Sequence, residues 1–379
     1  MKKKILILAN SSAGLYDFRN EFVEALLAEH EVVISLPDEV KTKELTEEGV
    51  RIVRTELDRR GVNPGRDLKL FNAYRRLLKE EKPDLVLTYT IKPNIYGGFC
   101  CRIRKIPYIT TITGLGSTFQ KEGLLKKLIV FLYRTALKKA ECVFFQNEYN
   151  LSVFDKYGIR GKKTALVPGS GVNLEKHPFE EYPSELPSGK GDMRTLRLLY
   201  VGRTMKEKGT DELLAAAEYF GEKSGAYKDP EGIRPEFLFL GYPDEDYQDI
   251  LDEYEKKGYI RQLGFDPDAH KYFRDAHAVI LPTYHEGMSN VLQEAAATGR
   301  PVIATDIPGC REIFEDGVTG IACKPRSAES LIEAIGRYLS LGAEERALMG
   351  KRGREKMERE FDRRKVTAAY MEEVRRIVN

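Results

Sequence analysis

Two basic residues in the second half of the chain have a spacing that suits the binding of a polyanion. Arg203 and Lys208 lie in the run Val201-Gly-Arg-Thr-Met-Lys-Glu-Lys-Gly209, between an apolar run and a helical pattern. In such a loop, with the positive end of a helix dipole behind them, the two cations can converge on one diphosphate. The alternative is that both are solvated loop charges.

Two acidic residues further along the chain have a spacing that suits a polyol. Glu286 and Glu294 lie in the run Pro282-Thr-Tyr-His-Glu-Gly-Met-Ser-Asn-Val-Leu-Gln-Glu294. We expect Ser289 or Asn290 to cap a helix, with Glu286 before it and Glu294 about one turn inside it. The carboxylates could then accept hydrogen bonds from vicinal hydroxyls, and the N–H groups between them could bind phosphate. A pair of exposed glutamates without a ligand is the alternative.

The strands and helices that position these side chains can be predicted from the sequence pattern. Apolar strand-like runs alternate with helical patterns, which predicts an α/β fold. We expect buried strands at residues 5–9, 31–35, 85–89, 108–112, 142–146, 196–201, 237–240, 278–282 and 301–305. A polar stretch rich in Pro, Ser and Gly after residue 180 interrupts the pattern. We therefore predict two Rossmann-like domains, 1–180 and 190–361, with parallel sheets that face a central cleft, and a helix at about 362–379 that packs back on the first domain.

A glycine after the first predicted strand offers a weaker signal. Gly14 follows Asn10-Ser-Ser-Ala, so N–H groups at the start of the next helix could face an anion, although such a glycine is more often only a turn. The segment lacks the G-x-G-x-x-G pattern, which counts against a nicotinamide dehydrogenase. His285-Glu286 is not part of H-E-x-x-H, because residue 289 is Ser, so that type of zinc site is excluded.

The charge is nearly balanced overall but unevenly distributed. Of the 379 residues, 61 are Lys or Arg and 59 are Asp or Glu, which excludes an acidic disordered protein and a uniformly basic nucleic-acid coat. Residues 85–140, however, contain ten basic residues and one acidic residue. Within them, residues 124–139 combine an apolar stripe with flanking lysines, as an interfacial helix on anionic lipid would. A core helix with a solvated basic face is the alternative, and no nucleic-acid-binding signature accompanies the charge.

The cysteines and the apolar runs indicate where the protein works. The five cysteines contain no C-x-x-C spacing, which favours a reducing cytosol. The longest apolar runs are too short for a signal peptide or a membrane span. We therefore expect a cytoplasmic protein that is peripheral on the cytoplasmic face of the membrane.

Taken together and in this order, these segments resemble the retaining glycosyltransferases of family 4, which have the GT-B fold. The resemblance covers nearly the whole chain and centres on the E-x7-E pattern of Glu286 and Glu294. It implies a UDP-sugar donor, no metal or other cofactor, and a reaction that retains the anomeric configuration. In the family, the residues matching Arg203 and Lys208 hold the donor diphosphate, the first Glu contacts the transferred sugar, and the second Glu binds the ribose. The donor-site positions that the resemblance implies are Gly14, Arg203, Lys208, Phe265, Glu286, Gly287, Met288, Ser289, Asn290 and Glu294.

Segments of the first half resemble one subgroup of this family. They contain Lys92, Asn94, Thr113 and Gly114, which we expect on the acceptor side. The subgroup adds N-acetylhexosamine or hexose units to polyprenyl-diphosphate-linked saccharides, and it includes N-acetylgalactosaminyltransferases that act on lipid-linked diacetylbacillosamine. Many family members carry a histidine after the strand matching residues 108–112, whereas this chain has Thr111-Ile-Thr-Gly114, so no histidine role is carried over.

Two alternatives share the expected architecture. A GT-B nucleotide-sugar 2-epimerase would release a free epimerised nucleotide sugar without any acceptor. A non-catalytic module would bind the nucleotide sugar tightly with neither transfer nor slow hydrolysis.

Overall fold

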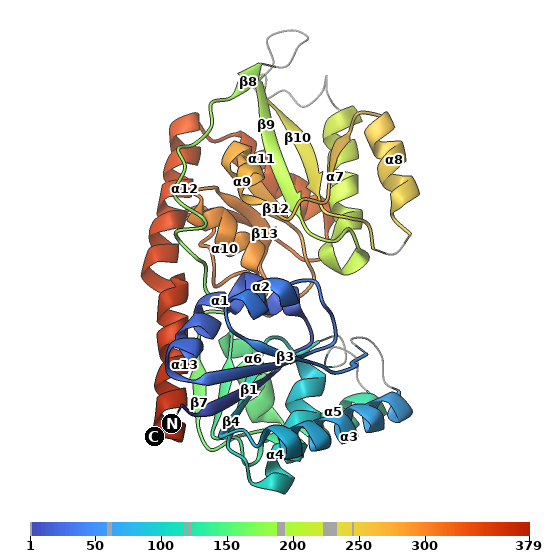
Figure 1. Ribbon diagram of the computed structural model, residues 1–379. Coiled ribbons are helices and arrows are strands. Elements are labelled where there is room, and N and C mark those ends of the chain that lie inside the picture. Colours follow the sequence, from blue (N-terminus) through green and yellow to red (C-terminus); the bar gives the residue numbers. More distant parts are fainter. Residues whose placement is uncertain are drawn as a thin grey trace. The chain divides into compact units, whose positions relative to one another are not determined.

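The computed structural model describes residues 2–58, 63–116, 119, 123–187, 194–222, 233–244 and 246–379, which form two compact units (Figure 1). Unit 1 comprises Met1–Gly171 and Arg363–Asn379, and unit 2 comprises Val172–Asp362. The chain therefore leaves unit 1 at Gly171, earlier than the predicted boundary near residue 180. The polar stretch expected to be the linker belongs to unit 2 as far as residue 187, and its residues 188–193 lie outside the described part of the chain.

Unit 1 is built on a parallel sheet with the strand order β3-β2-β1-β4-β5-β6-β7. Its strands are β1 (Lys4–Leu8), β2 (Glu31–Leu36), β3 (Arg51–Arg54), β4 (Leu85–Tyr89), β5 (Tyr108–Ile112), β6 (Cys142–Phe145) and β7 (Thr164–Leu166). Because the pairings are parallel, the carboxyl ends of these strands share one edge of the sheet.

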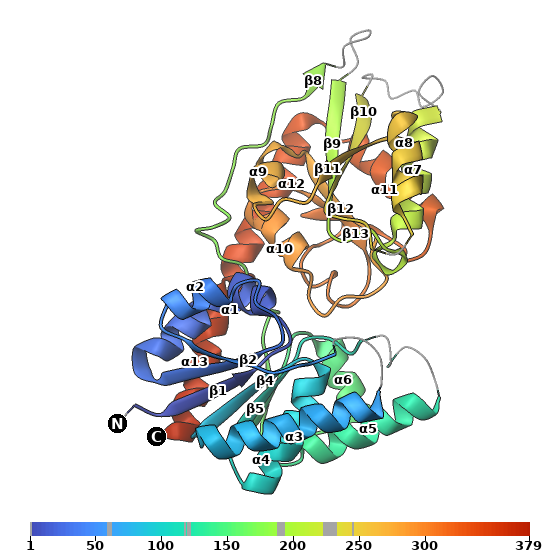
Figure 2. The same ribbon diagram turned by 45° about the vertical axis from the view of Figure 1, so that its right-hand side comes forward.

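Helices cover both faces of this sheet, and each face has its own apolar cluster (Figure 2). One face is covered by α1 (Ser12–Glu29), α2 (Thr42–Glu47) and α13 (Arg363–Val378). The other is covered by α3 (Pro64–Glu81), α4 (Gly98–Arg104), α5 (Leu124–Leu137) and α6 (Glu148–Lys156). This two-sided burial explains why the central strands are continuous apolar or β-branched runs.

The C-terminal helix α13 belongs to unit 1, although it follows unit 2 in the chain. The Tyr370 ring stacks on Phe144 with 4.0 Å between ring centroids, and its hydroxyl lies 2.9 Å from the Thr111 hydroxyl. Arg363 pairs with Glu21 of α1 at 3.1 Å. Residues 363–379 thus complete the core of unit 1.

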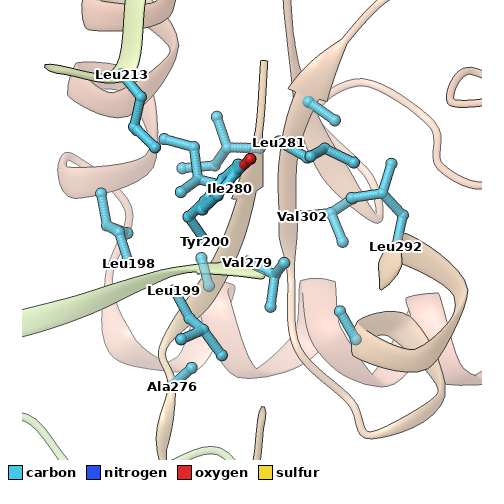
Figure 3. Close-up of a cluster of buried hydrophobic side chains, with 14 of the residues drawn as sticks. Leu198, Leu199, Tyr200, Leu213, Ala276, Val279, Ile280, Leu281, Leu292 and Val302 are labelled. Carbon is cyan, nitrogen blue, oxygen red and sulfur yellow. The ribbon is translucent and has the colours of Figure 1, made fainter. Parts of the chain in front are cut away.

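Unit 2 has the doubly wound order β11-β10-β9-β12-β13-β14, with all these pairings parallel and with a short β8 antiparallel to β9. Its strands are β8 (Leu186–Pro187), β9 (Arg194–Val201), β10 (Ile233–Leu240), β11 (Ile260–Gly264), β12 (Ala278–Leu281), β13 (Val302–Thr305) and β14 (Gly320–Cys323). Its helices are α7 (Thr210–Glu222), α8 (Gln248–Lys256), α9 (His270–Asp275), α10 (Asn290–Ala297), α11 (Ala328–Leu339) and α12 (Ala343–Lys356). Figure 3 shows the apolar side chains of β9, β12 and β13 packed with Leu213 and Leu292 of the neighbouring helices. The fold is therefore α/β with two Rossmann-like units, as predicted.

None of the helices in the described part of the chain combines the length and the apolar character needed to cross a bilayer.

Candidate active site

The predicted donor-site residues of unit 2 follow strands that end at one edge of its sheet. The loop after β9 contains a short 3₁₀ turn, Lys206–Lys208, and then Gly209 with φ +74°. A Cβ atom at residue 209 would lie 2.1 Å from the carbonyl oxygen of Pro282, which follows β12. The backbone N–H of Tyr284 also donates to the Glu207 carbonyl at 2.9 Å. The loops after β9 and β12 are therefore held tightly together, and only glycine fits at position 209.

The structure brings Lys208 and Glu286 into direct contact. The Lys208 ammonium lies 2.5 Å from the Glu286 carboxylate, and the two side chains are 27% and 16% exposed. The resemblance assigns the first residue to the diphosphate and the second to the transferred sugar. Their contact means that each side chain limits the position and the effective charge of the other.

Arg203 pairs with an acid that the sequence analysis missed. Its guanidinium contacts Asp244, which lies in the loop after β10, and its backbone carbonyl accepts a 2.6 Å hydrogen bond from the Tyr200 hydroxyl. Nothing in the local sequence marks Asp244, because the pairing arises from the neighbouring positions of β9 and β10 in the sheet.

The Tyr200 hydroxyl is buried next to the loop that carries Arg203 and Lys208. Burial raises the pKa of Tyr200 well above its usual value, the Glu286 carboxylate raises it further, and Arg203 acts in the opposite direction. Because Arg203 and Lys208 belong to the same loop after β9 and Lys208 contacts Glu286 after β12, the contacts support a common site at the carboxyl ends of β9 and β12.

Of the two residues that the sequence analysis offered as the cap of α10, Ser289 has that role. The Ser289 side chain caps the helix by accepting from the backbone N–H of Leu292 at 3.4 Å. The Ser289 N–H donates to the Gly309 carbonyl at 2.9 Å, and a Cβ atom at Gly309 would lie 2.7 Å from the Glu286 carbonyl oxygen. Met288 is buried beneath this turn, while Gly287 and Asn290 are half-buried.

Glu294 lies within α10 and takes no part in the contact between Lys208 and Glu286. Its carboxylate is 4.0 Å from the Nε2 atom of His177, which belongs to the segment that enters unit 2. The sequence analysis did not identify His177. The two glutamates thus have different neighbours, which is consistent with different roles.

Phe265 follows β11 and is exposed, as is Tyr242 after β10. Their ring centroids are 5.9 Å apart and the rings meet edge to face. Two exposed aromatic rings in contact at this edge offer apolar surface on which a flat ligand group could stack.

Gly14, which was expected near the start of the first helix, lies in the first turn of α1. Its N–H donates to the capping Ser11 hydroxyl at 3.2 Å. The N–H of Ser12, the first residue of the helix, donates to the Asp38 carboxylate at 3.0 Å. Side chains of the protein therefore satisfy these two amides, and the anion site near Gly14 stays a prediction.

The predicted acceptor-side residues occupy unit 1. Lys92 pairs with Asp67 at 2.8 Å, and both side chains are largely buried. Asn94 is only 1% exposed and donates to the Thr111 carbonyl at 2.9 Å, so its burial favours a structural role. Thr113 and Gly114 are half-buried and follow β5.

No three His, Cys, Asp or Glu side chains within the described ranges are grouped so that they could hold a metal ion.

Two Rossmann-like units are the architecture of the GT-B fold, and comparison with known proteins identifies the class of protein that uses it here. Residues 187–356 match the family "Glycosyl transferases group 1", and residues 4–147 match "Glycosyl transferase 4-like". Together the two matches cover most of the chain, which therefore belongs to this group of glycosyl transferases.

Two curated relatives are informative. The chain is 26% identical over 350 residues to the N,N'-diacetylbacillosaminyl-diphospho-undecaprenol alpha-1,3-N-acetylgalactosaminyltransferase of Campylobacter jejuni, covering 89% of each chain. It is 24% identical over 287 residues to the UDP-Gal:alpha-D-GlcNAc-diphosphoundecaprenol alpha-1,3-galactosyltransferase of Escherichia coli, covering 73% of this chain and 72% of the relative.

Solved structures confirm the fold. HepE from Anabaena, solved in complex with UDP and glucose, matches with a TM-score of 0.76 at 18% identity, covering 98% of this chain and 99% of the other. Sucrose-phosphate synthase from Thermosynechococcus elongatus also matches with a TM-score of 0.76, at 19% identity and 99% coverage of both chains.

Proposed function

We propose that this protein is a retaining glycosyltransferase that moves an N-acetylhexosamine or hexose unit from a UDP-sugar to a polyprenyl-diphosphate-linked saccharide. The product would serve the assembly of a surface polysaccharide or a glycoprotein glycan. The carrying observation is the Lys208–Glu286 contact beside Arg203 at one sheet edge. The names of the Campylobacter jejuni and Escherichia coli relatives support the lipid-linked acceptor, and the second supports the UDP donor.

In the proposed reaction, the bond between the anomeric carbon and the diphosphate oxygen breaks. The acceptor hydroxyl oxygen forms its new bond on the same face, and its proton passes to the leaving phosphate. Arg203, Lys208 and the N–H groups near Gly287 would neutralise the charge that develops on the diphosphate. Glu286 would hold the sugar and Glu294 the ribose, through hydrogen bonds that their carboxylates accept from hydroxyl groups. The proposed chemistry requires no metal and no other cofactor.

The test begins with ligand binding to the purified protein. UDP should raise the melting temperature more than ADP, GDP or dTDP, because a ligand bound only by the folded state stabilises it, by about 2.7 kcal/mol at 100 times its Kd. The UDP-sugar that stabilises most is then offered with a panel of polyprenyl-diphosphate-linked saccharides, and the product is identified by mass spectrometry. A free epimerised nucleotide sugar would indicate the epimerase instead. Tight binding with neither transfer nor hydrolysis across the panel would indicate a non-catalytic module.

We further propose that the enzyme works on the cytoplasmic face of the membrane and contacts anionic lipid through the basic segment 85–140. Helix α5 presents Leu124, Leu128 and Phe131 at a spacing of one helical face, and these side chains are 84%, 47% and 60% exposed. The opposite side of α5, which includes Val130 and Tyr133, is buried in unit 1. Exposed apolar side chains on a helix that is also basic match the composition of an interfacial helix.

Vesicle sedimentation checks this contact. Replacing Leu124, Leu128 and Phe131 by Ser should weaken binding to anionic vesicles several-fold, because apolar burial and charge both contribute. Replacing Lys126, Lys127, Lys138 and Lys139 by Ser should do the same and should remove the salt dependence. Leu348→Ser, an exposed leucine of α12 in unit 2, is the matched control. Unchanged sedimentation of both the leucine–phenylalanine variant and the lysine variant would rule out this segment as the contact. Lys121, which also belongs to the segment, lies outside the described residues.

A further inference from the structure

The loop after β10, residues 241–244, runs beside the Arg203 loop beyond the ends of the two strands. The backbone N–H of Thr204 donates to the Tyr242 carbonyl, and the N–H of Asp244 donates to the Thr204 carbonyl, both at 3.0 Å. The parallel pairing of β9 with β10 thus continues past Val201 and Leu240. This continuation fixes which residue of one loop lies opposite each residue of the other.

Glycine is required for this close approach. Gly241 has φ +147°, and a Cβ atom on it would lie 2.0 Å from the Gly202 carbonyl oxygen. The N–H of Gly202 donates to the Leu240 carbonyl at 2.9 Å, and the N–H of Gly241 donates to the Gly264 carbonyl at 2.8 Å. The backbones that carry Arg203 and Asp244 are therefore held rigidly to the ends of β9, β10 and β11.

Arg203 is held at both ends by this arrangement. Its carbonyl accepts from the buried Tyr200 hydroxyl, and its Nη1 atom contacts the Asp244 carboxylate. The remaining N–H groups of the guanidinium make no ion pair with any other acid among the described residues, and the side chain is partly exposed. A guanidinium that contacts one carboxylate through a single nitrogen still has donors to offer to a second anion.

We propose that Asp244 is a positioning residue that orients the Arg203 guanidinium toward the diphosphate of the donor. The inference rests on the proposed function, because it takes the anion that Arg203 binds in addition to Asp244 to be the diphosphate of the donor. Holding Arg203 before the ligand arrives removes part of the cost of ordering a long side chain on binding. Asp244 itself carries the same sign of charge as the donor, so its benefit must come through Arg203.

A double-mutant cycle tests this assignment, with the Kd of UDP measured by titration calorimetry and kcat measured with the UDP-sugar selected above. We expect Arg203→Gln to weaken UDP binding by at least tenfold and Asp244→Asn to weaken it by about fivefold, with kcat also lowered. In the Arg203→Gln background, Asp244→Asn should change the Kd by less than twofold. Asp246→Asn, which removes an exposed acid two residues away, is the control for net charge and should have little effect.

Three outcomes would overturn the assignment. If Asp244→Asn weakened UDP binding by the same factor with and without Arg203, Asp244 would not act through Arg203. Tighter UDP binding with unimpaired turnover in Asp244→Asn would show that Asp244 competes with the donor. Asp244→Asn could also lower the melting temperature and weaken UDP binding and turnover in proportion, both with Arg203 present and with it replaced. The same result for Asp244→Ser would then show that Asp244 has a purely structural role. Absence of UDP binding by the unmodified protein is a different result, because it would refute the proposed function as well.

Discussion

Replacing Lys208 by alanine is expected to lower kcat by about 10²- to 10³-fold, the usual effect of removing one preorganised charge-stabilising donor. The ammonium would neutralise the leaving diphosphate, and its loss also leaves the Glu286 carboxylate without its partner. The first consequence acts on the leaving diphosphate and the second on the residue assigned to the transferred sugar. Turnover depends on both and should therefore fall more than the affinity for UDP, which depends on the first alone. Steady-state release of UDP, measured with saturating donor and acceptor, checks the prediction.

Lys206→Ala provides the matched control for this variant. Lys206 lies in the same 3₁₀ turn, but its side chain is 68% exposed and it lies 4.0 Å from Asp211. Its removal should change turnover by less than about twofold, as is usual for exposed ion pairs. Similar losses in the two variants would mean that the turn as a whole, and not the Lys208 ammonium, supports catalysis.

The second large effect is expected when the two glutamates of the E-x7-E pattern are compared. Glu286→Gln should lower kcat by about 10²-fold, because a charge-assisted hydrogen bond contributes about 1.5–3 kcal/mol. It should leave the Kd of UDP unchanged or slightly improved, since UDP lacks the transferred sugar and Lys208 is released from its acid. Glu294→Gln should instead weaken UDP binding by about tenfold, because the ribose is present in UDP.

Calorimetry with UDP and with the intact donor distinguishes these effects. A larger loss of UDP affinity in Glu286→Gln than in Glu294→Gln would reverse the two assigned roles. Unchanged kinetics and affinity in both variants would remove the pattern from the active site. The melting temperature of each variant controls for unfolding.

The central strands of both sheets could be predicted from the sequence, and the edge strands could not. β4 and β5 are buried on both faces, so Leu85–Tyr89 and Tyr108–Ile112 are continuous apolar or β-branched runs. The strands that the sequence analysis missed are the short antiparallel β8 and the outermost strands of the two parallel arrays, which are β3, β7, β11 and β14. An edge strand such as Arg51–Arg54 is short and flanked by charges, so it lacks that signal.

In the site, too, contacts between residues close in the chain could be predicted from the sequence, and contacts between distant residues could not. The capping role of Ser289 follows from residues within one turn of it, and it was predicted as one of two choices. The Lys208–Glu286 and Arg203–Asp244 contacts join residues 78 and 41 positions apart in the chain. Which acid meets which base depends on strand order and register, and these emerge only when the sheet forms.

The return of α13 to unit 1 has a consequence for synthesis on the ribosome. Unit 2, Val172–Asp362, leaves the exit tunnel complete, whereas unit 1 still lacks the helix whose Tyr370 covers Phe22 and Phe144. The N-terminal unit therefore finishes folding last, contrary to the usual order of translation. A chain that terminates just after Asp362 would carry a complete unit 2 and an incomplete unit 1 whose aromatic core is exposed to proteases.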